Sequence, residues 1–528
     1  MKDVTNLSLS LVTPPAFRLN TGQKLGLTTA VLGVVLLLLA LFGVHFPSPG
    51  AFLALSLGLM AAGGVWYARA AYDHDPAGIR NNGVWHRNLT ARGAFAWGLG
   101  IVLTALYILL YWFPQYLGLG QDGAANTGLI ALFDPLCMAL EGNAASQWFV
   151  YGTLYTVAIL VMGYKFIRKY RNNRYQVIRT ISVMFFQLGF AFLLPEILLG
   201  LNKPYNDFKN MWPLNYYFFE GWHIKELIGN GTLGLFMLVW GVLMILLISP
   251  VLTWFYGKRW YCSWVCGCGG LAETAGDPFR HLSDKRVKAW RIERWMIHGV
   301  LVFATAMTIA VLYGVLDQAK GAYLITKAHL VWGVTGIFVL LAAFLFLRPK
   351  YFKNLAPVAK WIALGVAALL LVFLWTAYLK GSSRVFFMNP EPLRKWYGFL
   401  IGSAFSGVIG VGFYPLMGSR VWCRFGCPMA AILGIQQKFL SRFRIITNGG
   451  QCISCGNCSA YCEMGIDVRA YAQKGQDVVR ASCVGCGICA AVCPRGVLRL
   501  ENSAADVSER AGELRALRIS ESGVTVVR

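Results

Sequence analysis

Long apolar stretches constrain this chain more than any other feature of its sequence. Ten of them are long enough to cross roughly 30 Å of hydrocarbon as α-helices. They cover residues 25–46, 50–72, 93–113, 147–167, 178–200, 228–256, 295–316, 327–347, 359–379 and 396–418. Of the 528 residues, 57% are hydrophobic and only 14% are charged, which is typical of a multi-span membrane protein. We therefore predict an α-helical polytopic fold with about ten transmembrane helices.

The distribution of basic residues predicts the topology. The connection after the fourth span carries no acid and six cations, Lys165, Arg168, Lys169, Arg171, Arg174 and Arg179, whereas the 114–146 loop has three acids and no cation. The positive-inside rule places basic loops in the cytoplasm. The same parity places inside Arg80, Arg87, Arg92, Lys258, Arg259, Arg348, Lys350 and Lys353, whereas Arg384, Arg394 and Lys395 fall outside against the trend. We expect a multi-pass protein of the cytoplasmic (inner) membrane with both termini inside, and no nucleic-acid partner despite a net charge of +24.

Eight of the 14 cysteines form two runs with the same C-x2-C-x2-C-x3-C spacing. The runs are Cys452, Cys455, Cys458 and Cys462, then Cys483, Cys486, Cys489 and Cys493. A tight loop with thiolates three residues apart supplies three corners of a [4Fe-4S] cubane, so the fourth ligand comes from elsewhere. This is the spacing of a bacterial two-cluster ferredoxin, in which the fourth cysteine of each run ligates the cluster of the other run. We therefore predict a small cytoplasmic α+β ferredoxin domain.

The predicted ligand sets exchange their fourth members. One cluster takes Cys452, Cys455, Cys458 and Cys493, and the other takes Cys483, Cys486, Cys489 and Cys462. Glycines 456, 485 and 487 let the backbone bend around the sulfurs. Zinc or disulfides are the alternatives, but a disulfide framework needs an oxidising compartment. Glu463 follows Cys462 where the second run has Pro494, which is a departure from the motif.

An internal repeat occupies the membrane half. Residues 257–266 align with residues 418–427 at a constant offset of 161, so that Cys262 and Cys266 correspond to Cys423 and Cys427. Each pair has i, i+4 spacing, which puts both sulfurs on one face if the segment continues as helix. The four thiols then predict a third cluster or metal site, redox-active dithiols, or a zinc site or inert buried cysteines. Cys268 offers a substitute ligand.

Several features near these motifs each allow two alternative roles. Arg259 and Arg420 beside the cysteine pairs either stabilise reduced, more negative thiolate centres or anchor the membrane interface. The aromatic 201–227 connection is expected to cap the outer interface or to dock an outer partner. Glu196 inside the fifth span could accept a quinol proton, or could be protonated or paired. Because C-x-x-C-H is absent, we predict no covalent c-type haem in this chain.

The paired C-x3-C motifs, the second followed by Pro428, together with a two-cluster ferredoxin, resemble the NapH/NosR/CcoG family of membrane polyferredoxins over about residues 230–500. Gly267 replaces the proline after the first pair, and the first five spans exceed a minimal NapH-like protein. The resemblance implies electron transfer at the cytoplasmic membrane, in service of respiratory reductases or metal-centre maturation. It also implies respiratory or redox partner subunits.

The expected organisation follows the motifs. It comprises a cytoplasmic N-terminal segment (1–24), a first five-span region (25–227), a second five-span region with the cysteine pairs (228–427), an amphipathic connector (428–448), the ferredoxin domain (449–500) and a tail (501–528). We expect an electron-transfer subunit of an oxidoreductase complex, with no catalytic residues of its own, that passes electrons between a quinol or soluble donor and a respiratory partner. The alternatives are a CcoG-like metal-ion reductase acting through the C-x3-C pairs and a redox-sensing structural subunit.

Overall fold

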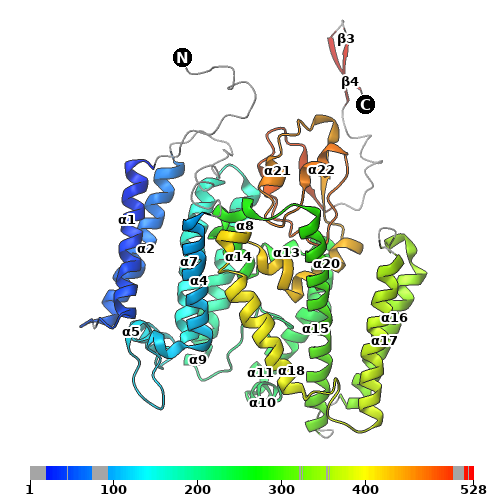
Figure 1. Cartoon of the computed structure of the whole chain (residues 1–528), viewed down its shortest axis with the longest axis horizontal. Coiled ribbons are helices and arrows are strands. Elements are labelled where there is room, and N and C mark those ends of the chain that lie inside the picture. Colours follow the sequence, from blue (N-terminus) through cyan, green and yellow to red (C-terminus); the bar gives the residue numbers. More distant parts are fainter. Residues whose placement is uncertain are drawn as a thin grey trace.

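The structure is a computed structural model that describes residues 19–44, 46–73, 93–319, 323, 325–352, 355, 357–502, 516–520 and 523–527. Long helices stand side by side, and a small module lies across one end of them (Figure 1). The interpretations placed on Arg80, Arg87, Arg92 and Lys353, on most of the N-terminal segment and on much of the tail lie outside the described residues.

Within the described residues, nine helices are long and apolar enough to cross a membrane. They are α1 (Thr21–Leu41), α2 (Pro49–Tyr72), α4 (Ala94–Trp112), α7 (Gln147–Lys169), Arg174–Gly200, Gly231–Tyr256, α15 (Val287–Ala319), α16 (Lys327–Leu347) and α17 (Pro357–Leu379). The fifth contains α8 (Arg174–Phe185), a π-helical segment and α9 (Leu194–Gly200), and the sixth contains α11 (Gly231–Leu243), a π-helical segment and α12 (Ser249–Tyr256). The polytopic helical fold is therefore confirmed.

The tenth predicted span, 396–418, has a different form from the other nine. Its residues run through the end of α18 (Pro390–Tyr397), a π-helical segment (Gly398–Ile409), a turn and α19 (Tyr414–Met417). A π-helix widens the backbone ring and occurs mostly as short insertions near functional sites. This segment leads directly into the second cysteine pair.

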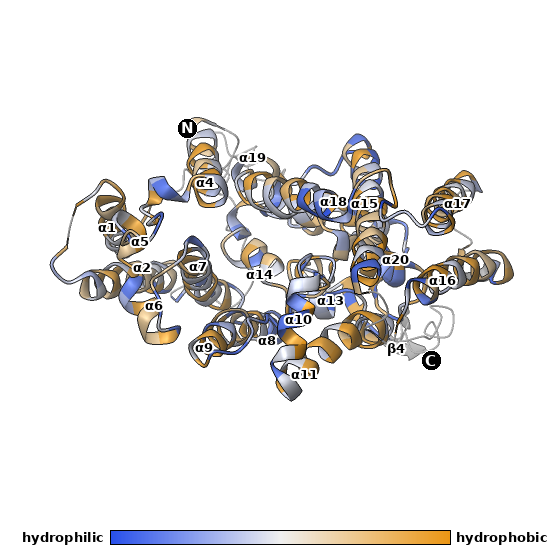
Figure 2. Ribbon diagram, turned by 90° about the horizontal axis from the view of Figure 1, so that it is seen from below, coloured by the Kyte–Doolittle hydropathy of each residue, from blue (hydrophilic) through white to orange (hydrophobic). Residues whose placement is uncertain are grey.

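Short helices lie between the spans and inside the bundle. They are α5 (Gly128–Ala131), α6 (Asp134–Leu140), α10 (Gly221–Gly229), α13 (Arg259–Cys262) and α14 (Gly267–Thr274). Seen along the spans, α13 and α14 lie within a ring of helices, while the α1–α2 and α16–α17 hairpins lie at its two ends (Figure 2). Helices α16 and α17 bury few residues, and those include Val331, Leu374 and Ala377, which share one small apolar cluster.

The module at the end of the bundle is a small α+β unit, called here the ferredoxin module (residues 444–501). Strands β1 (Arg444–Thr447) and β2 (Leu498–Glu501) pair antiparallel, with Arg444 opposite Glu501. Between them lie α21 (Asn457–Ala460), α22 (Val468–Gln473) and α23 (Ile488–Ala491). The predicted connector forms α20 (Pro428–Phe439), and its last residues belong to β1. A separate hairpin pairs β3 (Ala516–Ser520) with β4 (Gly523–Val527).

One hydrophobic core joins the module to the membrane helices. The same cluster of buried side chains contains Met237 and Met307 of the spans, Cys262 and Cys423 of the repeat, and Val484 of the module. Helix α20 forms part of this junction: a Cβ on Gly434 would lie 2.6 Å from the Ala481 oxygen. The module is therefore packed into the rest of the protein rather than tethered beside it.

Candidate metal centres

The two cysteine runs of the ferredoxin module share one backbone conformation. Ser454 and Gly456 have φ values of 59° and 80°, and the residues 31 positions later, Gly485 and Gly487, have 64° and 75°. Gly456 and Gly487 each precede a one-turn helix that carries the third cysteine of its run. Left-handed backbone is what glycine permits at no steric cost, and it bends each loop around a common centre.

Two cavities lie inside these loops, and each is lined by four cysteines. The first cavity is lined by Cys452, Cys455, Cys458 and Cys493. The second cavity is lined by Cys483, Cys486, Cys489 and Cys462. The structure thus brings together the same two sets that the spacing predicts, each with three members from one run and one from the other. Four thiols around one cavity form a donor set that fits a [4Fe-4S] cluster.

The two cavities differ in their access to solvent. Cys455 is exposed and Ile453 beside it is 57% exposed, whereas Cys483 and Cys489 of the second cavity are buried. Burial raises the pKa of the Cys483 thiol to about 11, because the thiolate is desolvated. Burial also raises the pKa of the Cys458 thiol of the first cavity to about 11, so the difference between the two cavities lies in their exposure.

The loop of the second cavity is held by side chains from outside the module. Tyr175 Oη donates to the Gly485 oxygen (3.0 Å), and Gln176 Nε2 donates to the Cys486 oxygen (2.8 Å). Gln437 Nε2 donates to the Cys483 oxygen at 2.7 Å. Ser263 Oγ donates to the Val484 oxygen at 2.9 Å. The second cavity therefore faces the membrane helices, and the first faces away from them.

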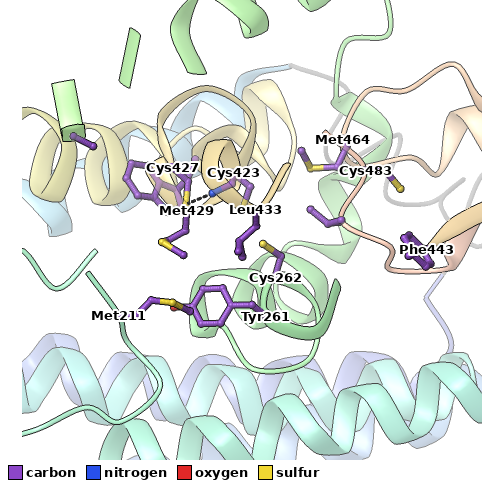
Figure 3. Packing of buried hydrophobic residues seen from close by; sticks show 14 of the residues in the cluster. Met211, Tyr261, Cys262, Cys423, Cys427, Met429, Leu433, Phe443, Met464 and Cys483 are labelled. Carbon is purple, nitrogen blue, oxygen red and sulfur yellow. Dashed lines mark hydrogen bonds between the residues drawn. The ribbon is translucent and has the colours of Figure 1, made fainter. Parts of the chain in front are cut away.

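The cysteines of the internal repeat also come together. Cys262, Cys423 and Cys427 are buried side by side above Tyr261 and Met211 (Figure 3). Cys266 and Cys268 share a hydrogen bond between their thiols, and Cys423 and Cys427 are close enough to raise the pKa of Cys268. We call these five residues the membrane thiol site. Five sulfurs gathered from both copies fit a third four-thiolate centre with one sulfur to spare.

The backbone of each copy corrects one expectation. The helix does not continue through the pair: Cys266 N donates to Tyr261 O (2.8 Å) and Cys427 N to Trp422 O (3.0 Å), which closes one wide turn. The second cysteine of each pair then becomes the N-cap of the next helix, α14 or α20, with extended backbone. Ala430 N donates to Cys427 Sγ at 3.4 Å. A helix N-terminus favours a thiolate, so this geometry suits a ligand better than a shared helical face.

Only one of the two repeat-related arginines lies beside thiols. Arg420 is fully buried, and its Nη1 donates to Cys262 O (3.2 Å) and to Cys423 Sγ (3.6 Å). The guanidinium of Arg259 instead lies over the Phe443 ring at 4.5 Å, and its Nη2 donates to Asn502 Oδ1 at 2.8 Å. The hypothesis that a positive charge stabilises a reduced thiolate centre therefore applies to Arg420. Arg259 instead packs on the ferredoxin module.

A lysine from the 201–227 connection reaches the other side of the membrane thiol site. Lys209 is buried, its Nζ donates to Gln187 Oε1 (3.3 Å), and a Cβ on Gly267 would lie 3.0 Å from that Nζ. The hydrogen bond from Cys268 lowers the pKa of Cys266 to about 6, and the charge of Lys209 acts in the same direction. Tyr205 and Trp222 are exposed as an interfacial belt predicts, but the middle of this connection inserts into the bundle.

The sequence analysis did not identify Lys209 or Glu273 as part of this site. It noted Glu463 only as a departure from the motif and did not predict that this side chain is buried. Glu273 is 2% exposed and Glu463 is 1% exposed. A signal existed for Glu463, since it replaces the proline of the motif, and none existed for Lys209 within an aromatic loop.

Cys137 is buried in α6, and Glu196 in α9 is hydrogen-bonded to Glu141. Helix α9 lies at the end of the bundle away from the ferredoxin module (Figure 1).

Comparison with known proteins agrees with these sites. A family described as "4Fe-4S dicluster domain" matches residues 451–498, and one described as "4Fe-4S binding domain" matches residues 238–288 and 400–446, the two copies of the repeat. The "Putative electron transport protein YccM" of Escherichia coli (strain K12) is 24% identical over 228 residues, which is 43% of this chain and 47% of that protein.

The chain thus spans about half the length of the curated relative it matches. No solved structure gives a significant match. The matches show 4Fe-4S binding regions and do not reach the specific NapH/NosR subfamily. Together with the helical spans and the cysteine-lined cavities, the matches show a membrane-helix protein with 4Fe-4S binding domains.

Proposed function

We propose that this protein relays electrons between a donor, either a membrane quinol or a soluble carrier, and a respiratory or redox partner subunit. Cys452, Cys455, Cys458 and Cys493 would hold one [4Fe-4S] cluster, and Cys483, Cys486, Cys489 and Cys462 a second. A third centre would use four thiols of the membrane thiol site. When bound, such clusters supply one-electron carriers whose potentials the surrounding charges, hydrogen bonds and burial adjust.

The observation that carries this proposal is the order of the three sites. The first cavity opens to solvent at Cys455, the second is buried against the membrane helices, and the membrane thiol site lies inside the bundle. Such an order suits a path from a soluble partner at the surface to a site within the membrane. The basic connections support a placement of the module on the cytoplasmic side of the inner membrane.

A metal-ion reductase acting through the C-x3-C pairs is the competing proposal. Cys266 favours it, because the hydrogen bond from Cys268 lowers the pKa of the Cys266 thiol and so favours the thiolate, which is the reactive form. Burial disfavours it, because Cys262, Cys423 and Cys427 are each no more than 7% exposed and a hydrated metal ion would have to reach them. Turnover of copper or iron that disappears in Cys262→Ser while both ferredoxin clusters persist would support the reductase and overturn the relay.

Iron and sulfide analysis with redox-poised EPR tests the relay on the full chain. Three cubanes require about twelve iron atoms and two require about eight. We expect about twelve in the natural protein and about eight in the double variant Cys423→Ser/Cys427→Ser, which leaves three thiols at the membrane thiol site, with the ferredoxin signals unchanged. Cys137→Ser, which removes a buried thiol outside the three sites, should retain about twelve. A content of about eight in both the natural protein and the double variant would refute the third centre.

A further inference from the structure

A chain of buried ion pairs connects the membrane helices to the ferredoxin module. In order, it runs Arg179–Glu273–Arg420–Glu463–Arg280–Asp277–Lys169. Arg420 Nε lies 3.0 Å from Glu463 Oε1, and Arg280 Nη1 lies 3.5 Å from Glu463 Oε2. All seven side chains are at most 3% exposed. Buried ion pairs cost desolvation and are weak evidence for stability by themselves, so their placement calls for another reason.

The middle of this chain lies between two of the cysteine sites. Glu463 directly follows Cys462, which lines the second cavity. One oxygen of Glu273, one of Glu463 and the sulfur of Cys486 lie within 4.8 Å of one another, so the carboxylates are also beside a second cysteine of that cavity. On the other side, Arg420 contacts Cys423 Sγ and Cys262 O of the membrane thiol site. The Arg420–Glu463 pair therefore bridges the two sites.

The charges explain why the bridge is an ion pair. Two carboxylates and a thiolate so close together would repel one another, and a cluster held by thiolates adds further negative charge. Arg179, Arg280 and Arg420 offset this repulsion from three directions. Neutralising one member leaves its partners as uncompensated buried charges, which act strongly on any neighbouring redox centre because the interior screens them little.

We propose that Glu463 and Arg420 are positioning residues that couple the second ferredoxin centre to the membrane thiol site. They fix the module with its second cavity toward the membrane site, and their opposite charges set the difference in potential between the two centres. In each transfer one electron leaves one centre and enters the other, while Glu463 and Arg420 are neither oxidised nor reduced. This inference rests on the proposed function, because it requires a redox centre on both sides of the pair.

The experiment is redox-poised EPR on the full chain with two neutralising substitutions. Glu463→Gln removes negative charge beside the second ferredoxin centre, so reduction there becomes easier and the potential rises. Arg420→Gln removes positive charge beside Cys423, so the potential of the membrane centre falls. We expect about a tenfold change in the reduced-to-oxidised ratio at fixed potential in each variant, equivalent to about 59 mV for one electron.

Matched controls separate charge from packing. Glu501→Gln neutralises a carboxylate of the same module that takes no part in this series of seven buried charged residues. It should leave both potentials unchanged. Arg259→Gln neutralises the repeat-related arginine, whose guanidinium lies on Phe443, and it should leave the membrane centre unchanged. Glu463→Asp and Arg420→Lys keep the charges, so each should show at most half of the shift in potential that the neutral variant shows. If the two residues were only structural, Glu463→Gln and Arg420→Gln would shift the potentials in the same direction or would lose iron. The proposal predicts shifts of opposite sign with full iron content.

Two outcomes refute different statements. Full iron content with unchanged potentials in both Glu463→Gln and Arg420→Gln overturns this inference and leaves the proposed function intact. About eight iron atoms in the unmodified protein overturns the third centre itself. If Glu463→Gln loses the second ferredoxin cluster, Glu273→Gln serves in its place, since Glu273 also pairs with Arg420. A raised potential at the membrane centre is then expected, and an unchanged one overturns the inference.

Discussion

At the scale of single residues, Gln437 shows how one side chain can join three segments. It is 2% exposed. Its Oε1 accepts from Lys258 N (2.9 Å), and its Nε2 donates to the oxygens of Arg480 (2.9 Å) and Cys483 (2.7 Å). The amide of Gln437 in α20 therefore contacts both the first copy of the repeat and the loop of the second cavity. If Gln437 were replaced by an apolar residue, these backbone partners would be left without a hydrogen bond.

Replacing this amide should loosen the second cavity. In Gln437→Leu each buried backbone group left unsatisfied costs about 1–3 kcal/mol. We expect a clear decrease in the thermal unfolding midpoint and faster loss of the second ferredoxin cluster to an iron chelator, followed by absorbance. Gln436→Leu is the matched control, because the buried Oε1 of Gln436 has no hydrogen-bond partner in the described structure. Equal effects of the two substitutions would contradict the role assigned to Gln437.

At the scale of elements, α14 depends on glycines to approach its neighbours. A Cβ on Gly269 would lie 2.0 Å from Cys262 O and 3.0 Å from Arg420 Nη1. A Cβ on Gly270 would meet Cγ1 of Val183 at 2.2 Å. The first contact is with backbone that cannot move without shifting Cys262, whereas the second is with a methyl group of α8 that belongs to neither cysteine segment.

This difference gives a prediction about the membrane thiol site. Gly269→Ala should separate α14 from α13 and reduce the iron content by about four atoms, one cubane. The EPR signals of the ferredoxin module should remain. Gly270→Ala is the control in the same helix and should retain more of the third centre. Full iron content and unchanged EPR in Gly269→Ala would show that the third centre does not depend on the close approach of α14 to Cys262.

The repeat is clearest at the scale of elements. Gly257 and Gly418 end the helices before the two cysteine pairs, and both have positive φ, 65° and 96°. A Cβ on Gly257 would lie 2.7 Å from Cδ1 of Phe443, and one on Gly418 would lie 2.8 Å from Ser283 N. Both copies therefore use a left-handed glycine to turn the chain sharply from a helix into its cysteine turn.

At the scale of the whole molecule, the module and the bundle behave as one body. They share a hydrophobic core, and the ion pairs between them are buried. Salt screens exposed charges over about 3 Å at 1 M but acts much less on buried pairs. We expect 1 M KCl to leave the proteolysis pattern of the detergent-solubilised protein unchanged. Release of the module by salt alone would show that its docking depends on surface charge.

The orientation of this body is testable by labelling. Asp122 lies exposed in the 114–146 loop, and Gln451 lies exposed at the start of the ferredoxin module. An impermeant maleimide should label Asp122→Cys in intact spheroplasts and Gln451→Cys only in inverted vesicles, since the basic connections favour the cytoplasm. Unmodified protein provides the background from the native cysteines. The reverse pattern would place the module outside.

The sequence by itself predicted the helical spans and the two groups of four cysteines that line the cavities. About twenty apolar residues are sufficient for a span, and a fixed cysteine spacing places three sulfurs around one centre. The exchange of the fourth cysteine between the runs was also predictable, since two equal runs can complement each other.

Only the tertiary structure decided which arginine lies beside a thiol, where Lys209 goes, and that Glu463 pairs with Arg420. The two arginines occupy equivalent positions in the repeat, yet one contacts Cys423 and the other Phe443. Charged groups acquire partners through long-range packing: Arg420 and Glu273 are 147 residues apart in the chain, and that separation follows no local period. Their burial depends on how the whole bundle closes around α13 and α14, and no short stretch of sequence encodes it.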